Sequence, residues 1–454
     1  MSKTVKLKKG LNIRLIGAAN KVKTEVAMPK MVSIKPSDFH GMTPKMLVKE
    51  GQEVKAGTII FQDKYNEPIK FSSPVSGEIE KIVRGEKRRI LEVLISTSQN
   101  QEFEISEIRS VESMSNDEVK STMLASGLWP FVKQRPLDIV ANPINEPKSI
   151  FVSAFDSSPL APDFNYVLQG KNKEFNAGME VLKKLTSGKV HLTINGKATA
   201  ESTFTDVKGV EINKIVGKHP AGNVGTQIHH IDPVNKGEFV WTVNAQDVSI
   251  IGRYFLNGKY NAKRTIALTG SEIKNPHYID TIIGANVADI LEGQITSDNV
   301  RVISGNVLTG DKISKDGYLG FYHNQITVIP EGNEYKFFLT TGWLGLGFDK
   351  FSNSRLFPTF ILPKSKKFRL DTNTNGEERA FVVTGELERV FPFDILPMQL
   401  AKAAITDDID GMENLGIYEV APEDFALCEY VCTTKIDIQD KIRQGLDLIA
   451  SECM

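Results

Sequence analysis

The chain has 454 residues, 41% of them apolar, and is long enough to build several domains with real hydrophobic cores. Its formal net charge of -1, from 55 basic and 56 acidic residues, excludes the basic footprint of a nucleic-acid-binding protein. Three cysteines are too few for a disulfide framework, and the N-terminus lacks the apolar core of a signal peptide. The apolar stretch Phe337–Phe348 is shorter than the about 18 residues of a transmembrane helix. We expect a soluble, cytoplasmic chain without a transmembrane segment.

The segment Lys45–Ile95 has the pattern of a small β-barrel or sandwich, because glycines separate short runs in which apolar and polar residues alternate. With EG-x-x-V-x-x-G before the central turn and SPVSG after it, the segment resembles the biotinyl/lipoyl-type barrel-sandwich module. Lys64 lies near the position of a lipoyl lysine. It stands ten positions before Pro74, however, and Pro68 interrupts the hairpin. We therefore favour an unmodified module used for assembly over a swinging prosthetic arm.

The next informative segment combines aromatic and basic side chains, namely Trp129, Phe131, Lys133 and Arg135. Such a cluster suits an aromatic ligand ring, but it also suits a loop seated on a hydrophobic core. We favour the loop seated on a core, because buried aromatic residues are common, and keep the ligand site as the alternative.

An α/β domain is predicted further along the chain. A buried strand over Ser149–Phe155, a helix over Ala177–Leu185 and a strand over Lys189–Ile194 make a parallel βαβ unit. A second apolar segment, Glu238–Val243, closes this domain. The pattern predicts a Rossmann-like arrangement, although no G-x-G-x-x-G follows a strand, so a dinucleotide site is unsupported.

The glycine- and histidine-rich stretch Lys218–Val234 is a candidate phosphate or metal site. A P-loop requires Lys and Ser or Thr after Gly-x4-Gly, but Asn223 and Val224 follow here. His229 and His230 would face opposite sides of a strand, so one metal ion could not easily take both. We therefore expect loop and core histidines and no metal.

The next domain opens with a strand over Arg264–Gly270, followed by an amphipathic helical pattern over Ile279–Leu291 that is broken at Gly284. Val300–Ser304 and Gln325–Ile329 are further expected strands. The segment resembles the SLBB β-grasp module, whose name does not imply a bound ligand.

The C-terminal part is expected to be helical after an irregular connector, Glu331–Arg379. Apolar residues at three- and four-residue spacing predict helices over Phe393–Thr406, Glu423–Val431 and Ile438–Ala450. The acidic stretch Thr406–Ile417 does not match a calcium loop and is expected to be a solvated loop between helices.

Cys428 and Cys432 form a C-x3-C pair. A ferredoxin-type cluster requires C-x2-C-x2-C-x3-C-P, but Phe425 and Pro422 occupy the first two cysteine positions and Thr433 replaces the proline. Two thiolates cannot hold a cubane cluster, so none is expected.

Four stretches, residues 8–19, 63–82, 218–234 and 376–432, resemble in the same order the A-subunit family of the bacterial Na+-translocating NADH:quinone oxidoreductase (Na+-NQR). The wider kinship is with the C-type component of the Rnf complex and the flavin-bearing component of respiratory complex I. Those relatives bind FMN through a glycine-rich loop and carry cysteine-ligated clusters. Here the corresponding SGLWPFVKQRP contains only Gly127, and its bulky Trp-Pro-Phe would block a close backbone approach to phosphate.

The resemblance implies a peripheral subunit on the cytoplasmic side of the bacterial inner membrane, in a complex that oxidises NADH, reduces ubiquinone and exports sodium. It implies the membrane and flavin subunits as partners, with FAD, FMN, riboflavin and 2Fe-2S on those other subunits. No catalytic, cofactor-binding or metal-binding residues are expected on this chain. The alternative is a flavin- or Fe-S-bearing NADH dehydrogenase subunit of Rnf or complex I type.

Quinone is the remaining ligand candidate, because the Na+-NQR family to which the resemblance points has been considered to bind quinone through this component. An apolar ring needs aromatic walls and one or two polar anchors. We predict Trp129 and Phe131 as the wall, with Arg135 or His219 as the anchor.

The expected fold class is a multidomain α/β protein. The expected domains are a barrel-sandwich module (1–100), a Rossmann-like degenerate flavin-binding domain (101–258), an SLBB β-grasp domain (259–330), an irregular connector (331–380) and a helical, degenerate Fe-S domain (381–454).

Overall fold

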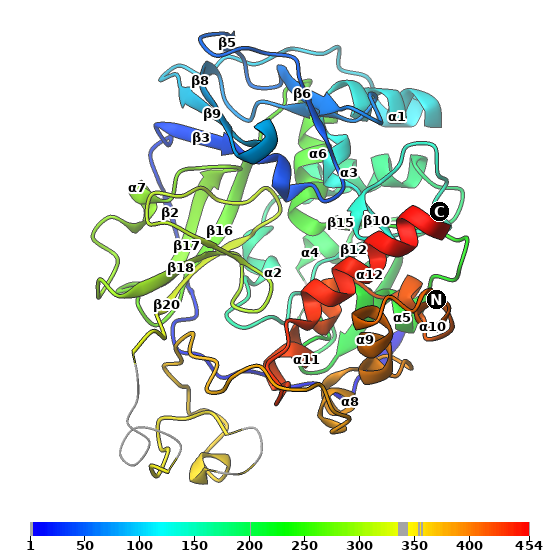
Figure 1. Cartoon of the computed structure of the whole chain (residues 1–454). Helices are drawn as coiled ribbons and strands as arrows, with labels where there is room; N and C mark the ends of the chain where they lie inside the picture. The colour runs from blue at the N-terminus through cyan, green and yellow to red at the C-terminus, as the bar shows by residue number, and fades with distance from the viewer. Residues whose placement is uncertain (1–2, 200, 335–343, 353–354, 356, 454) are drawn as a thin grey trace.

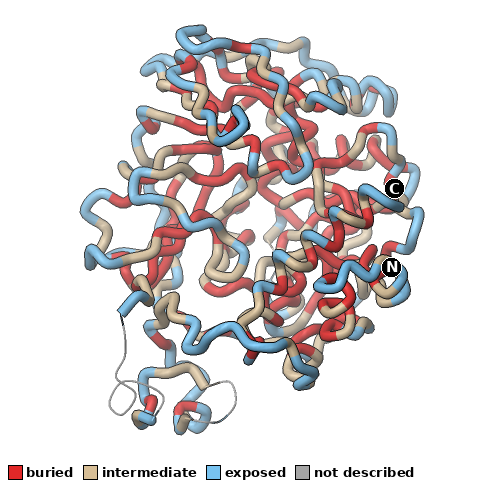
Figure 2. Tube along the Cα trace, in the orientation of Figure 1, coloured by how far each residue is buried: buried red, intermediate tan, exposed pale blue. Residues whose placement is uncertain are grey.

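The computed structural model describes residues 3–199, 201–334, 344–352, 355 and 357–453 (Figure 1). In this described part, four β-sheets precede a C-terminal group of helices, and buried residues run through the interior (Figure 2). The architecture is the predicted multidomain α/β class. None of the described helices is long and apolar enough to cross a membrane. Most of the apolar stretch Phe337–Phe348 lies outside the described residues.

The barrel-sandwich module consists of two small antiparallel sheets, at the top of Figure 1. Buried and exposed positions alternate at the start of the strand Gly77–Arg84, and buried and half-buried positions alternate over residues 93–96 of the strand Ile90–Thr97, as expected for a sheet with one face on a core. Phe61 and Phe71 stack inside it with ring centroids 4.6 Å apart. The strands are β3 (Met31–Ile34), β4 (Pro44–Met46), β5 (Glu53–Val54), β6 (Ile59–Asp63), β7 (Lys70–Ser72), β8 (Gly77–Arg84) and β9 (Ile90–Thr97).

The first 25 residues join the later domains. β1 (Thr4–Lys6) pairs in parallel with β14 (Glu211–Val216) of the α/β sheet. β2 (Asn20–Glu25) pairs with β17 (His277–Ile282) at the edge of the next sheet. The N-terminal segment therefore ties three parts of the molecule together.

The α/β domain has a seven-stranded sheet in the order β1-β14-β13-β12-β15-β10-β11. The predicted parallel βαβ unit is confirmed, since β12 and β13 pair in parallel and α3 (Asn172–Lys184) lies between them in the chain. The chain builds β13 and β14 on one side of β12 and then crosses to place β15 on the other side. The remaining strands are β10 (Lys133–Arg135), β11 (Ile139–Val140), β12 (Ser149–Ser153), β13 (Lys189–Asn195) and β15 (Val240–Asn244).

Six α-helices accompany this sheet in the described residues. They are α1 (Asn116–Ala125), α2 (Phe164–Val167), α3 (Asn172–Lys184), α4 (Ser202–Thr205), α5 (Val224–Ile231) and α6 (Ala245–Asn257). The strand geometry assumed for His229 and His230 is wrong, because both lie in α5. The helix forms because its apolar face, including Ile228, packs against Phe151 of β12 in a small buried cluster.

The SLBB domain has a six-stranded sheet in the order β19-β18-β20-β16-β17-β2. The helix predicted to begin near Ile279 is wrong, since β17 is a strand hydrogen-bonded on both sides. Pairing with β16 and β2 overrides the local three-residue spacing, and a short helix, α7 (Ala288–Leu291), remains. The other strands are β16 (Lys263–Thr269), β18 (Val300–Ser304), β19 (Asp311–Ile313) and β20 (Gln325–Pro330).

The C-terminal helices enclose a core of their own, which also takes in Ile13, Leu15 and Leu137 from distant parts of the chain. The stretch Thr406–Ile417 is not entirely a loop. Asp408 caps a short helix within it by accepting a hydrogen bond from the backbone of Gly411 at 2.9 Å. The helices are α8 (Glu386–Val390), α9 (Pro397–Ile405), α10 (Ile409–Asn414), α11 (Ala426–Val431) and α12 (Ile438–Cys453).

Candidate functional site

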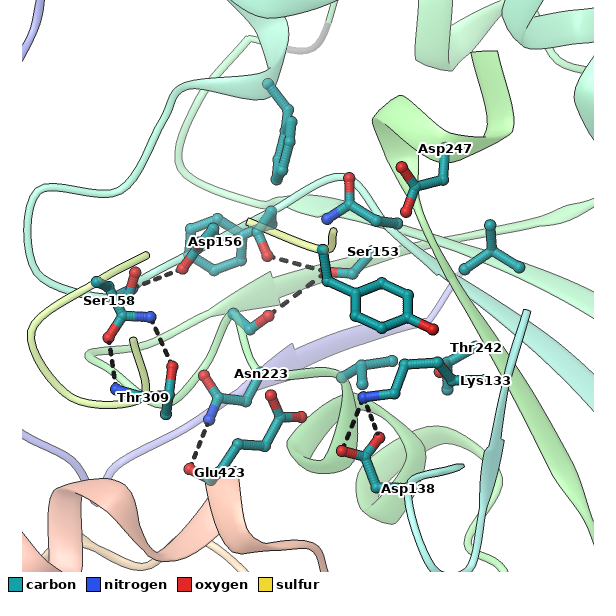
Figure 3. Close-up of a pocket in the computed structure, with 18 of the residues that line it drawn as sticks. Lys133, Asp138, Ser153, Asp156, Ser158, Asn223, Thr242, Asp247, Thr309 and Glu423 are labelled. Atoms are coloured by element: carbon teal, nitrogen blue, oxygen red, sulfur yellow. Dashed lines mark hydrogen bonds and ion pairs between the residues drawn. The ribbon is translucent and has the colours of Figure 1, made fainter. Parts of the chain in front are cut away.

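A cavity of about 210 Å³ opens at the carboxyl ends of β12 and β15 (Figure 3). This is the crossover point of the sheet, where open α/β folds commonly bind ligands. Its walls come from three domains, because the loop Asn306–Thr309 and Tyr322 belong to the SLBB domain and Glu423 to the C-terminal part. Its aromatic and aliphatic lining is Phe131, Phe155, Phe164, Val224, Val243, Leu308 and Tyr322.

The aromatic segment is divided between the core and the cavity. Trp129 is buried in the core, where its Nε1 donates to the carbonyl of Ala141 at 2.6 Å and its ring meets Trp241 edge-on at 5.3 Å. It is not among the described residues that line the cavity, whereas Phe131 is. Phe131 also stacks on Phe321 of the SLBB domain, with ring centroids 4.9 Å apart.

Arg135 is buried, with 2% of its side chain exposed, and forms an ion cluster between two domains. Its guanidinium donates to Glu423 at 2.6 Å and to Asp424 at 3.2 Å, and its Nε lies 3.5 Å from Asp138. The acidic partners Glu423 and Asp424 belong to a short 3-10 helix, Pro422–Phe425, directly before α11. Arg135 therefore joins β10 to the C-terminal helices, as a loop seated on its neighbours would.

His219 lines the cavity and is 4% exposed. Burial lowers the pKa of His219 to about 4, so the imidazole is neutral at pH 7. Its Nδ1 lies 3.1 Å from the hydroxyl of Ser157, which in turn accepts the backbone N–H of Gly222 at 2.7 Å. Because that hydroxyl can donate to Nδ1, this arrangement favours a tautomer with the hydrogen on Nε2.

Carboxylates dominate the charge around the cavity. The described lining residues include one lysine, Lys133, and four carboxylates, namely Asp138, Asp156, Asp247 and Glu423. Lys133 is paired with Asp138 at 2.8 Å. Burial raises the pKa of Asp247 to about 6 and that of Glu423 to about 7, although Arg264 and Arg135 act in the opposite direction. An anionic group would meet net negative charge here.

The residues do not fit a flavin phosphate. Gly127 has φ +70, and a Cβ on it would lie 2.1 Å from the Ser72 hydroxyl, so this glycine serves the contact with the barrel module. A Cβ on Gly225 would lie 2.4 Å from both carboxylate oxygens of Asp424. Gly127 and Gly225 are thus used for close packing between domains.

The two C-terminal cysteines are buried and have protein neighbours. Burial raises the pKa of Cys428 well above its usual value, which disfavours the thiolate that a cluster needs. The sulfur of Cys432 lies 3.0 Å from the Thr434 hydroxyl. Within the described ranges, no group of three or more His, Cys, Asp or Glu side chains could hold a metal ion.

His229 and His230 have separate partners. Nδ1 of His229 lies 2.8 Å from Glu419, and its Nε2 accepts the backbone N–H of Asp394 at 3.0 Å. His230 contacts the carbonyl of Pro392 at 3.1 Å. Both histidines therefore bind the C-terminal part to α5.

The sequence prediction missed several lining residues. Asn244 and Asp247 could have been identified, because they follow the apolar segment Glu238–Val243, which forms most of β15 and ends at the edge where ligands bind. Tyr322 and the Asn306–Thr309 loop carry no such signal, since another domain brings them to the cavity.

Three family models match successive parts of the chain. They are described as the NqrA N-terminal barrel-sandwich hybrid domain (residues 5–98), the NqrA second alpha/beta domain (114–260) and the NQRA C-terminal domain, which is of SLBB type (265–315). A barrel-sandwich hybrid, an α/β domain, an SLBB domain and a helical stretch together define a class of multidomain α/β protein.

Several proteins are similar to this chain over nearly its whole length. The A subunit of Na(+)-translocating NADH-quinone reductase from Neisseria meningitidis serogroup A is 39% identical over 99% of this chain and 100% of its own length. The corresponding proteins of Haemophilus influenzae strain PittGG and Marinomonas sp. strain MWYL1 are also 39% identical. The Haemophilus protein matches over 99% of this chain and 100% of its own length. The Marinomonas protein matches over 98% of this chain and 99% of its own length. The chain belongs to the NqrA family, the A subunits of Na(+)-translocating NADH-quinone reductase, and is a component of that enzyme.

Among solved structures, a chain of NAD+-reducing [NiFe]-hydrogenase in the H2-reduced state covers 75% of this chain and 62% of its own length. Its sequence identity is 10% and its TM-score is 0.38. At this level of similarity, nothing further follows for this chain.

Proposed function

We propose that this chain is a cofactor-free subunit that binds a quinone ring in the crossover cavity, on the cytoplasmic side of the membrane. The observation that carries the proposal is a ring-sized cavity with aromatic walls and a neutral histidine at the ligand position of an α/β sheet. The redox groups FAD, FMN, riboflavin and 2Fe-2S are assigned to the other subunits, which are also the proposed partners.

The size of the cavity supports a ring rather than a whole flavin nucleotide. Its volume is about 210 Å³, whereas sites for drug-sized ligands have about 300–1,000 Å³. An engineered apolar cavity of about 150 Å³ takes benzene. A substituted quinone ring fits between these limits, with its tail outside.

The lining offers suitable chemistry for a neutral ring. Phe131 and Tyr322 provide flat apolar contact from two domains. His219 is the proposed anchor, because a neutral imidazole with hydrogen on Nε2 donates to a quinone carbonyl without introducing charge. Of the four residues predicted from the sequence, Phe131 and His219 thus keep a direct role, while Trp129 and Arg135 support the surrounding structure.

Filling the cavity should abolish quinone labelling. In the Leu308→Trp variant, the larger side chain enters the cavity from the SLBB loop, where Leu308 is half-buried. We expect photolabelling of residues 127–135 and 218–230 by an azido-quinone to fall at least about tenfold, the equivalent of about 1.4 kcal/mol of binding free energy. Labelled peptides are quantified by mass spectrometry, with and without excess unlabelled quinone.

The matched control is Ile313→Trp, which enlarges another half-buried aliphatic residue of the same domain outside the cavity. It should leave labelling unchanged. Labelling that never falls within the two peptides, or that survives in Leu308→Trp, would show that quinone does not bind here.

A further inference from the structure

Large apolar side chains are exposed on a segment that projects from the body after β20, drawn in yellow to orange at the bottom of Figure 1. Among the described residues, five of the nineteen exposed large apolar side chains lie between positions 344 and 361. Leu346 is 73% exposed and Ile361 72%. Soluble proteins rarely leave such groups together unless the surface meets a partner or a membrane.

Basic residues accompany these apolar groups. Positions 344–369 of the sequence contain six Lys or Arg residues and one acidic residue, Asp349, although the whole chain carries a net charge of -1. Lys364, Lys366 and Lys367 are all exposed. We define the docking patch by its exposed members, Leu344, Leu346, Phe348, Phe360, Ile361, Lys364, Lys366 and Lys367.

The base of the projecting segment is held firmly by the N-terminal strand region. Phe368 is 2% exposed, and its backbone N–H donates to the carbonyl of Arg14 at 2.7 Å. The Arg14 guanidinium lies over the rings of Phe351 and Phe368, at 5.3 and 5.1 Å, and donates to the carbonyl of Pro363 at 2.9 Å. The projecting segment therefore stands on a fixed base, and much of its described trace is exposed (Figure 2).

We propose that the docking patch rests on an anionic lipid surface beside the membrane subunits. The chain is a subunit of an ion-translocating enzyme, so a bilayer is a neighbour of the assembled complex. Leu and Phe side chains enter the boundary between headgroups and acyl chains, while lysines pair with anionic headgroups. A protein groove would explain the apolar groups equally well, but the excess of exposed lysines complements lipid phosphate.

Binding of the full-length chain to vesicles tests the proposal. We expect the chain to float with vesicles that contain phosphatidylglycerol and to bind phosphatidylcholine vesicles at least about tenfold more weakly. Reversal of three charges, Lys364→Glu, Lys366→Glu and Lys367→Glu, should weaken binding to the anionic vesicles about 100-fold at low salt. The double variant Leu346→Asp with Ile361→Asp should also lose binding.

The matched control is Ile105→Asp with Ile144→Asp, two equally exposed isoleucines outside the patch, at 77% and 86%. It should bind as the unaltered chain does. A Leu346→Trp reporter, which keeps the apolar character, should be quenched by brominated lipid. The proposal would be overturned if the unaltered chain did not bind the anionic vesicles, or if the patch variants bound them as well as the unaltered chain does. It would also be overturned if the patch variants lost assembly with the other subunits while their binding to lipid stayed unchanged. The lipid proposal rests on family membership and on this surface, and not on the cavity. The vesicle experiment can therefore fail or succeed independently of the quinone-labelling experiment.

Discussion

Arg135→Met should lower the free energy of unfolding by about 3–5 kcal/mol, because it leaves the buried carboxylate of Asp424 and the partly exposed carboxylate of Glu423 without their counter-charge. Asp424 is fully buried, and Glu423 lies beside it on the same short 3-10 helix. Both belong to the element that leads into α11, so the docking of the C-terminal helices on β10 should weaken as well. Urea unfolding followed by tryptophan fluorescence measures the loss.

The loss should depend on pH. Burial raises the pKa of Glu423 to about 7 even with Arg135 opposite, and removal of the guanidinium raises it further. The folded variant therefore keeps this proton up to a higher pH than the folded unaltered chain does, whereas the two unfolded chains bind protons alike. Since the two folded chains differ in the protonation of Glu423 only above about pH 7, the destabilisation should grow as the pH rises above 7 and be smallest below it.

The control for this variant is Arg389→Met. Arg389 pairs with Glu386, but 63% and 38% of these side chains are exposed. An exposed pair of this kind contributes at most about 1 kcal/mol. Equal losses for the two variants, or a loss at Arg135 that does not change with pH, would contradict the buried ion cluster.

Gly252→Val should destabilise the chain by about 3 kcal/mol or more, because α3 and α6 meet through glycine backbones. A Cβ on Gly252 would lie 1.8 Å from the carbonyl oxygen of Glu174, and one on Gly178 would lie 2.0 Å from that of Val248. No rotamer relieves a clash with backbone. Since α6 also carries Asp247 into the cavity, separation of the helices should disturb the candidate site.

Gly376→Val is the matched control, because this exposed glycine has the flexible end of Lys435 as its nearest neighbour, at 3.3 Å. Its effect should stay within about 0.5 kcal/mol. Thermal unfolding measures the loss of stability in each of the two variants. A Gly252→Val protein as stable as the unaltered chain would contradict the prediction, because it would show that α3 and α6 can move apart at little cost.

The sequence predicted those parts of the fold that local pattern determines. The continuous apolar run of β12 and the three- and four-residue spacing of α3 and α12 are visible without tertiary knowledge. Glycine spacing likewise indicated the barrel-sandwich module.

Long-range contacts decided the remainder. β17 has the spacing of a helix, but two neighbouring strands hold it extended. The two carboxylates that accept hydrogen bonds from Arg135 lie almost 300 positions away in the sequence, so a cluster that suits a ligand by sequence proved to be bound mainly to protein. The candidate cavity could be placed only at the sheet edge, because its SLBB and C-terminal walls depend on domain packing.

The visible absorption of the purified full-length chain, with iron and acid-extractable flavin measured on the same sample, shows whether this subunit is free of redox cofactors. Glycines occupied by domain contacts, a small acidic cavity and two buried thiols disfavour both cofactors. We expect a colourless protein with neither flavin nor iron in stoichiometric amount. A yellow or brown chain that carries one flavin or one cluster per molecule would contradict this and would favour the flavin- or Fe-S-bearing alternative.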